Sequence, residues 1–365
     1  MAQVNPTTIK AIGLKDPKGD LQLIQVPLKQ LGPKDLLVRI EAVSINPVDY
    51  KKLQSVRVQT ISQDNPVVLG FDASGVVVKT SSDCKLFNIG DQVIYSGEYS
   101  KQGTNANFQI VDERIVGKKP KKLSHAEAAA IPLVSLTAYE GIVEEMRISP
   151  TEKHKNQDKY ILIVGGAGGV GSTAIQIAKK ILGLKVIATA SRLESVDFCK
   201  KMGADFVINH QIPLAEELKK INISSLDYIF NCVEMKPSYF EQFASIIKPF
   251  GRIVGIVGFD EPLNLQALFL KRAKISIECM FTRSMYGELP EKQNQILNKI
   301  SELYDYGIFI PTVQTKKLFS LQNLIDAHNQ SKSGKTIGKI SLYDVQNFFG
   351  VEKKVQKKTS CFGFI

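Results

Sequence analysis

The pattern of hydrophobic and polar positions divides the chain into two parts. Up to about residue 134, short runs rich in Val and Ile are separated by Gly, Pro, Asn and Asp, as in an all-β barrel or sandwich. From about residue 135 to 285, apolar strands alternate with helix-length segments, which predicts an α/β fold with a doubly wound parallel sheet. The predicted strands of this sheet lie in YILIVG, KVIATA, DFVINH, SLDYIFNCV, GRIVGIVG and KISIECM.

A glycine-rich turn, GGAGGVG, joins the first of these strands to the helix that follows. In a G-x-G-x-x-G motif, the first glycine makes the tight turn, the second lets the backbone approach a pyrophosphate, and the third lets helix and strand pack closely. The helix N-terminus offers free N–H groups to the anion. A merely structural turn is the alternative, but the strand before it and the βα units after it favour a dinucleotide site. The residues of this predicted site are Gly166, Gly168, Gly169, Val170 and Gly171.

The end of the second strand indicates which dinucleotide binds. NAD-binding folds usually place Asp or Glu about 20 residues after the glycine motif, where it binds the ribose 2′-OH. Here Ser191 and Arg192 stand at that place, and a hydroxyl and a guanidinium suit a 2′-phosphate. We therefore expect NADPH rather than NADH. The alternative is that Arg192 is a solvated surface residue.

Length and composition agree with two globular domains: the 365 residues are 44% hydrophobic and 23% charged. We expect a substrate domain over 1–134 that is completed by 307–346, a dinucleotide-binding domain over 135–306, and a basic tail over 347–365. The five cysteines are widely spaced and form neither a disulfide framework nor a metal knuckle. No uninterrupted apolar run has the ~18–20 residues of a membrane helix, and the N-terminus lacks a signal-like core, so we expect a cytoplasmic protein.

The net charge of +11 favours polyanionic partners in general. Part of this charge is concentrated in two lysine clusters, at 118–122 and 353–358. No aromatic residues are interleaved with these lysines, so a solvated surface is a better interpretation than a nucleic-acid site.

Several motifs are together specific enough to indicate a family. They are INPVDYK at 45–51, GFDASGVV at 70–77, GDQV at 90–93, AAAIPLVSLTAYEGI at 128–142, KMGADFVIN at 201–209, CMFTRSMY at 279–286 and GKTIGKISL at 334–342. With the glycine turn, they resemble the medium-chain dehydrogenase/reductase superfamily, in particular its zinc-free quinone oxidoreductases and a subgroup of zinc-type alcohol dehydrogenase-like proteins. The resemblance implies a GroES-like β-barrel domain, a Rossmann domain, hydride transfer to a quinone or an α,β-unsaturated carbonyl, and a homodimer.

The name of that subgroup raises the question of zinc. Zinc-dependent members of the superfamily carry a Cys ligand in the first motif and a G-H-E sequence in the second. Here the first motif has no cysteine, and in Gly70-Phe71-Asp72 the phenylalanine stands where the histidine ligand would be. The cysteine cluster of a structural zinc is also missing. We therefore expect no metal site, and a zinc alcohol dehydrogenase is the weaker alternative.

Without a Lewis acid, the substrate carbonyl needs hydrogen-bond donors. Asn46 and Tyr50 lie in the motif that lines the substrate cleft of the family, and we expect them to be the catalytic donors. Each has an alternative interpretation. Asn46 suits the N-cap of a helix that starts at Pro47, and Tyr50 suits an aromatic residue at the rim of the cleft.

The resemblance also implies further cofactor contacts. Thr137 matches a contact near the nicotinamide and its ribose. Cys232 and Val257 lie at the ends of the fourth and fifth strands, and the carboxyl ends of strands face the ligand in such folds. Lys339 matches a lysine near the cofactor, and His210, where relatives often have a tyrosine, is placed to meet a 2′-phosphate.

The leading hypothesis is an NADPH-dependent, zinc-free oxidoreductase acting on quinones or α,β-unsaturated carbonyls. The alternative is a non-catalytic or moonlighting nucleotide-binding subunit of a larger assembly, or an RNA binder, whose basic tail docks on a partner. The intact glycine motif argues against an enzyme that has lost its activity, since such a chain need not keep the motif. Cys361 is the fifth residue from the C-terminus, one position away from a prenylation box, so we expect no lipid anchor.

Overall fold

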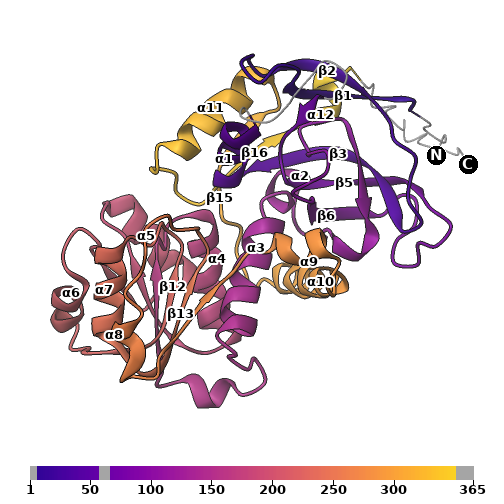
Figure 1. The fold of residues 1–365 in the computed structure, drawn as a ribbon. Coiled ribbons are helices and arrows are strands. Elements are labelled where there is room, and N and C mark those ends of the chain that lie inside the picture. The colour runs from indigo at the N-terminus through magenta and orange to yellow at the C-terminus, as the bar shows by residue number, and fades with distance from the viewer. Residues whose placement is uncertain (1–5, 57–65, 351–365) are drawn as a thin grey trace, which may run out of the picture.

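The computed structural model describes residues 6–56 and 66–350 and places them in two parts that lie side by side (Figure 1). One part is a β-barrel to which both the N-terminal and the C-terminal described segments contribute. The other is a parallel sheet covered by helices. This arrangement confirms the α/β fold class that the hydrophobic pattern predicts.

The barrel is built around the long strand β3, which pairs antiparallel with β5, β7 and β16. A three-stranded sheet has the order β2-β1-β4, and a second sheet has the order β15-β16-β3-β5-β6-β8. β3 is central because most of DLLVRIEAVSI is apolar and buried. The strands are β1 (Thr8–Leu14), β2 (Gln22–Pro27), β3 (Asp35–Ile45), β4 (Val67–Val68), β5 (Asp72–Thr80), β6 (Gln92–Ser96), β7 (Phe108–Asp112), β8 (Val116–Lys118), β15 (Val313–Leu318) and β16 (Lys339–Tyr343).

The second sheet has six parallel strands in the order β11-β10-β9-β12-β13-β14. Neighbouring side chains of β9 enter opposite cores: Ile161 and Ile163 pack on one face, Leu162 and Val164 on the other. The strand order reverses between β9 and β12, which is where such sheets bind ligands. The strands are β9 (Tyr160–Val164), β10 (Lys185–Thr189), β11 (Phe206–Ile208), β12 (Leu226–Asn231), β13 (Ile247–Gly255) and β14 (Lys274–Ile277).

Two groups of helices cover this sheet. On one face pack α3 (Pro132–Tyr139), α4 (Gly169–Gln176), α5 (Leu193–Met202) and α10 (Glu291–Asp305); on the other pack α6 (Leu214–Lys220), α7 (Pro237–Ile246) and α8 (Gln266–Phe269). α9 (Phe281–Tyr286) follows β14. The barrel carries α1 (Pro47–Val56), α2 (His125–Ala128), α11 (Leu321–Lys332) and α12 (Val345–Phe348), and the short or π-helical turns are η1 (Glu113–Ile115), η2 (Glu140–Glu145), η3 (Lys153–Asn156) and η4 (Ile177–Ile181).

Two elements of the returning segment are not predicted by the sequence pattern. β15 pairs in parallel with β16, and α11 packs against α1 and β3. β15 is an edge strand whose residues are half-buried or exposed, with two lysines among them. A charged edge strand protects the sheet from aberrant pairing, but it is difficult to distinguish from a loop in a sequence.

The last described residues pack onto the barrel. Gln346 donates to two backbone carbonyls of the barrel, and the rings of Phe348 and Phe349 lie 5.3 and 5.7 Å from the ring of Phe319. The basic tail expected from residue 347 therefore starts with packed residues. Residues 351–365, on which the expected docking to a partner depends, lie outside the described residues.

Within the described residues, one helical run has the length and hydropathy of a membrane span, His125–Glu145. It comprises α2, α3 and η2, and 89% of its apolar window is buried inside the protein. α3 packs against α4 and α10 on one side and the barrel strand β6 on the other. The apolar character of the run is thus accounted for by its place in the core.

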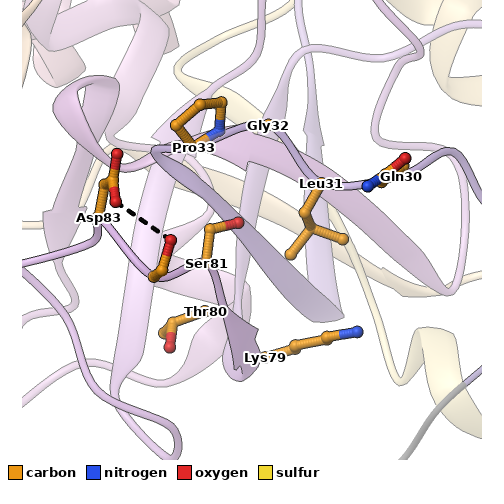
Figure 2. Close-up of a pocket in the computed structure, with 9 residues that line it drawn as sticks. Gln30, Leu31, Gly32, Pro33, Lys79, Thr80, Ser81 and Asp83 are labelled. Atoms are coloured by element: carbon orange, nitrogen blue, oxygen red, sulfur yellow. Dashed lines mark hydrogen bonds between the residues drawn. The ribbon is translucent and has the colours of Figure 1, made fainter.

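A groove of about 560 Å³ lies on the surface of the barrel (Figure 2). It is lined by residues 30–33 and 79–83, and a hydrogen bond of 3.1 Å joins Ser82 Oγ to Asp83. These residues lie at the Thr80 end of β5. The candidate site lies at the other end of this strand, roughly 25 Å away along an extended chain.

Candidate functional site

The glycine turn forms between β9 and α4, over residues 165–167, and includes the predicted Gly166. The glycine in the left-handed backbone conformation is Gly165, with φ of 75°, and not Gly166. The N–H of Gly165 donates to Thr189 Oγ1 (3.0 Å) and the N–H of Gly166 donates to Thr189 O (3.2 Å), which ties the turn to β10. A run of adjacent glycines does not reveal which member adopts positive φ, so the sequence alone does not single out Gly165.

The remaining glycines serve two different purposes. A Cβ on Gly166 would lie 2.7 Å from the Cβ of Ala188, and a Cβ on Gly171 would lie 2.2 Å from Gly165 O, so both positions are filled by packing. A Cβ on Gly168 would meet only Gly165 O, at 3.4 Å. This position is open and lies at the start of a helix, where a pyrophosphate can approach the backbone. The residues of the turn therefore fit a dinucleotide.

The residues expected at a 2′-phosphate lie at adjacent strand ends. Ser191 and Arg192 follow β10, His210 follows β11, and these two strands pair in parallel. Arg192 and His210 are exposed, and Arg192 Nη2 donates to Lys335 O (2.9 Å). Lys335 comes from the returning segment, far away in the sequence, which is why sequence reasoning missed it.

The residues expected near the nicotinamide lie at the carboxyl edge of the sheet and on α3. The N–H of Cys232 donates to Val164 O (3.2 Å), so the end of β12 lies against the end of β9, and Val257 follows the neighbouring β13. Burial raises the pKa of the Cys232 thiol well above its usual range, which keeps the thiol un-ionised. Thr137 is buried, and its Oγ1 donates to a backbone carbonyl one turn earlier in α3 (2.9 Å).

Lys339 is buried between the glycine turn and the barrel, with its charge directed into the barrel. Its stem packs on Gly169, where a Cβ would lie 2.7 Å from Lys339 Cδ. Val170, the next residue of α4, is half-buried against the hydrophobic core between α4 and the parallel sheet. All three ammonium N–H groups are engaged, so the charge of Lys339 is held inside the protein. The acceptors are Ile45 O (2.9 Å), Asn46 Oδ1 (2.5 Å) and Asp72 Oδ2 (3.1 Å).

The side chain of Asn46 binds this lysine and does not cap α1. Its Nδ2 donates to Asp72 Oδ2 (2.7 Å), and its own backbone N–H donates to Asp49 Oδ2 (2.7 Å). Both ends of the amide are thus engaged, and Asn46 is only 1% exposed. Asp72 also accepts from the N–H of Leu133 at the start of α3 (2.8 Å). Sequence reasoning missed the role of Asp72, although it occupies the last position of the G-H-E-like motif.

α1 contributes three further side chains to this region. Tyr50 is half-buried, and burial raises the pKa of its phenol, which keeps it protonated. Asp49 is fully buried, and burial raises its pKa to about 7. Lys52 is buried with its Nζ 5.1 Å from the ring centroid of Phe71 and 4.7 Å from that of Tyr99. Asp49 and Lys52 were not singled out from the sequence, although they flank the predicted Tyr50.

The side chains gathered here do not fit a zinc ion. Phe71 offers only ring carbon, Asn46 is committed to Asp72 and Lys339, and the ammonium of Lys52 would repel a metal cation beside Phe71. In the part of the chain that the structure describes, no three His, Cys, Asp or Glu side chains gather as metal ligands would. We assign no chemical step to a metal.

Two families of known proteins match long stretches of the chain. Zinc-binding dehydrogenases match residues 169–298, and the alcohol dehydrogenase GroES-like domain matches residues 32–153. A zinc-type alcohol dehydrogenase-like protein of Staphylococcus aureus is 42% identical over 311 residues, which cover 84% of this chain and 90% of that protein. A chloroplast NADPH-dependent alkenal/one oxidoreductase of Arabidopsis thaliana is 28% identical over 326 residues, which cover 88% and 75%.

The fold is shared with solved structures as well. A candidate zinc-dependent alcohol dehydrogenase from Rhizobium etli is 38% identical and superimposes with a TM-score of 0.83 over 92% of this chain and 98% of that one. Together with the barrel and the parallel sheet, these likenesses show that the chain belongs to the medium-chain dehydrogenase/reductase superfamily of oxidoreductases.

Proposed function

We propose that the chain is an NADPH-dependent, zinc-independent oxidoreductase that transfers hydride to quinones or α,β-unsaturated carbonyls. The observation that carries this proposal is the open backbone position at Gly168, next to a barrel wall that presents proton donors in place of metal ligands. The likeness to an alkenal/one oxidoreductase that uses NADPH supports both the cofactor and the substrate class.

The preference for NADPH is supported by the side chains beyond β10. Ser191 and Arg192 stand where an NAD-binding fold would have an acid, and Arg192 is held beside the strand end by its bond to the backbone carbonyl of Lys335. His210 follows the neighbouring strand. A hydroxyl group and a guanidinium match a phosphate monoester, which a carboxylate would repel.

The bound cofactor would supply the hydride from its nicotinamide ring. Gly168 and the N-terminal N–H groups of α4 would hold the pyrophosphate. Thr137, Cys232 and Val257 lie where the carboxyl edge of the sheet meets α3, and we propose that they position the nicotinamide end and exclude water from it. Their buried and half-buried environment suits this role, because hydride transfer depends mainly on positioning.

Tyr50 and Asn46 take different roles in this proposal. The half-buried phenol of Tyr50 is protonated and is available to donate to a substrate oxygen. Both ends of the Asn46 amide are already bonded to Asp72 and Lys339. Asn46 would therefore act by fixing the start of α1 beside the glycine turn, and not by direct contact with the substrate.

A homodimer is part of the proposal. β14 is an edge strand of the parallel sheet, and Ile277 on this strand is 61% exposed. Beside it lies an apolar groove of about 350 Å³ lined by Phe259, Leu263, Leu265 and Ile275. Because an exposed apolar edge can pair with the same edge of a second copy, we expect two chains to join here. Light scattering from the purified protein tests this, and the mass of a single chain would contradict it.

The function is tested by following the consumption of NADPH and NADH by the purified protein, with 9,10-phenanthrenequinone or a simple enone as acceptor. We expect saturable turnover with NADPH. Arg192→Ala should weaken NADPH binding about tenfold, the equivalent of one charge-assisted hydrogen bond, and leave NADH binding unchanged. Lys201→Ala, at an exposed lysine on α5, is the matched control.

Two results would overturn the proposal in different ways. Equal use of NADPH and NADH would contradict the assignment of Ser191 and Arg192 to a 2′-phosphate. Tight NADPH binding without turnover of either acceptor would contradict the enzymatic role and favour a nucleotide-binding subunit.

A further inference from the structure

The barrel side of the candidate site contains two buried lysines whose ammonium groups make different contacts. Lys339 donates its three N–H groups to three acceptors. Lys52, which is 9% exposed, has a single acceptor within residues 6–56 and 66–350, the backbone oxygen of Tyr99. An ammonium group has three donors, so Lys52 retains two that these residues do not engage.

Aromatic rings hold the charge of Lys52 without consuming those donors. Its Nζ lies 5.1 Å from the ring centroid of Phe71 and 4.7 Å from that of Tyr99. The ring of Phe281 completes the cluster, 4.7 Å from Phe71 and 5.5 Å from Tyr99. Rings of this kind stabilise a cation through their faces, which are negative, and leave its N–H groups free for a polar ligand. We call Phe71, Tyr99 and Phe281 the aromatic cluster.

Charged groups next to Lys52 can exchange protons with it. Asp49 lies three residues earlier on α1, so the two side chains share one face of the helix. Its Oδ1 is buried without a hydrogen-bond partner among the described residues, and burial raises its pKa to about 7. Burial lowers the pKa of Lys52, an effect that the charge of Asp49 opposes. The ion pair of Asp72 and Lys339 stands behind Asp49.

We propose that Lys52 is a catalytic residue whose ammonium group donates to the carbonyl oxygen of the substrate and stabilises the negative charge that hydride transfer creates there. This inference rests on the proposed function and specifies the group that replaces a metal at this site. The place is consistent with that role, because Lys52 lies over Phe71, the residue that stands where a histidine ligand of zinc would be.

The step balances as a two-electron reduction. The β-carbon of an enone gains a hydride from the reduced nicotinamide, and the C=C electron pair moves through the α-carbon to leave an enolate oxygen. This oxygen takes a proton from the ammonium of Lys52, and the resulting enol converts to the saturated carbonyl. The neutral amine regains a proton from Asp49 or from water. For a quinone, the same proton completes the hydroquinone.

The first test compares Lys52→Met and Lys52→Arg with the wild-type protein. Lys52→Met should lower kcat roughly 100-fold, as the loss of an oxyanion donor does, without changing NADPH affinity. Wild-type kcat should fall at alkaline pH as Lys52 loses its proton. Lys52→Arg should keep part of the activity and lose this decline, because arginine stays protonated. Lys10→Met is the control, since Lys10 also donates to one backbone carbonyl of the barrel, that of Phe349 (2.9 Å).

A second test needs no turnover. The phenolate of 4-nitrophenol mimics an enolate oxygen, and its colour reports its ionisation. Bound to the wild-type protein with NADP⁺, the phenol should ionise at lower pH than in water, because Lys52 stabilises the anion. Lys52→Met should abolish this shift, and Lys10→Met should preserve it.

The outcomes separate the two proposals. If Lys52→Met keeps wild-type kcat and the same phenol ionisation, Lys52 only clamps Tyr99 onto α1 and the inference is wrong. If the wild-type protein reduces neither acceptor but still shifts the phenol in a Lys52-dependent way, the proposed function fails while the oxyanion site remains. If Lys52→Met does not fold, an unshifted phenol on the wild-type protein overturns the inference.

Discussion

The two sides of the candidate site, the sheet wall and the barrel wall, are built in different ways. The wall formed by the parallel sheet consists of backbone from consecutive residues, the turn at 165–171, with its orientation set by β9 and β10. The barrel wall consists of side chains from the junction of β3 and α1, from β5 and from β16, which meet in the cluster of Asn46, Asp72 and Lys339. We expect the backbone wall to tolerate substitutions of the side chains around it. The stability of the wall made of buried charges depends on each of its charged partners.

The largest expected effect comes from breaking the barrel wall. Asp72→Ala leaves the ammonium of Lys339 buried without its counter-ion, and we expect a loss of about 3–5 kcal/mol in the free energy of unfolding. Urea unfolding measures this. Asp72→Ala combined with Lys339→Met should be more stable than Asp72→Ala alone, because no unpaired charge remains. A cost below about 1 kcal/mol for the single variant would show that the pair is dispensable.

The glycine turn allows a sharper comparison within the other wall. Gly171→Ala would force a Cβ to within 2.2 Å of Gly165 O and should cost about 1–3 kcal/mol of stability, as overpacking does. Gly168→Ala adds a Cβ that meets only Gly165 O, at 3.4 Å, and should leave stability unchanged but weaken NADPH binding at least tenfold. Thermal unfolding and nucleotide titration of both variants distinguish the two effects. Equal NADPH affinity of Gly168→Ala and the wild-type protein would contradict the assigned pyrophosphate site.

A smaller effect is expected from a third set of buried charges, next to the aromatic cluster. Glu140 and Glu278 are buried together, and burial with their mutual repulsion raises the pKa of Glu278 from 4.5 to about 9. Arg283 pairs with Glu140 (3.5 Å) and Glu144, and lies on α9 with Phe281. The folded state therefore keeps protons that the unfolded state releases, and stability should fall as pH rises from about 5 to 9.

Glu278→Gln replaces a carboxyl group that keeps its proton in the folded state with an amide that does not titrate. The melting temperature of the variant should change less between pH 6 and pH 9 than that of the wild-type protein, by a few degrees. Glu288→Gln, at an exposed glutamate, is the control. If both variants keep the wild-type pH dependence, Glu278 does not hold a proton in the folded state.

Sequence reasoning was most reliable where structure depends on neighbours in the chain. The six strands of the parallel sheet and the helix that starts at Pro47 were predicted because hydrophobic period and the preference of proline for the first helical position are local. β15 and α11 were missed, since a charged edge strand and a helix with few apolar residues give weak patterns. Gly165 was not singled out as the residue with positive φ, because backbone φ is not visible in a run of glycines.

The two-part α/β architecture and the glycine turn can be predicted from local patterns, because hydrophobic period and glycine spacing act over a few residues. The roles of the charged side chains depend on contacts that form only in the folded protein. Asn46, Asp72 and Lys339 are far apart in the chain, and whether an ammonium group is saturated or has donors to spare depends on which acceptors folding brings to it. That difference separates Lys339 from Lys52, which no local pattern distinguishes.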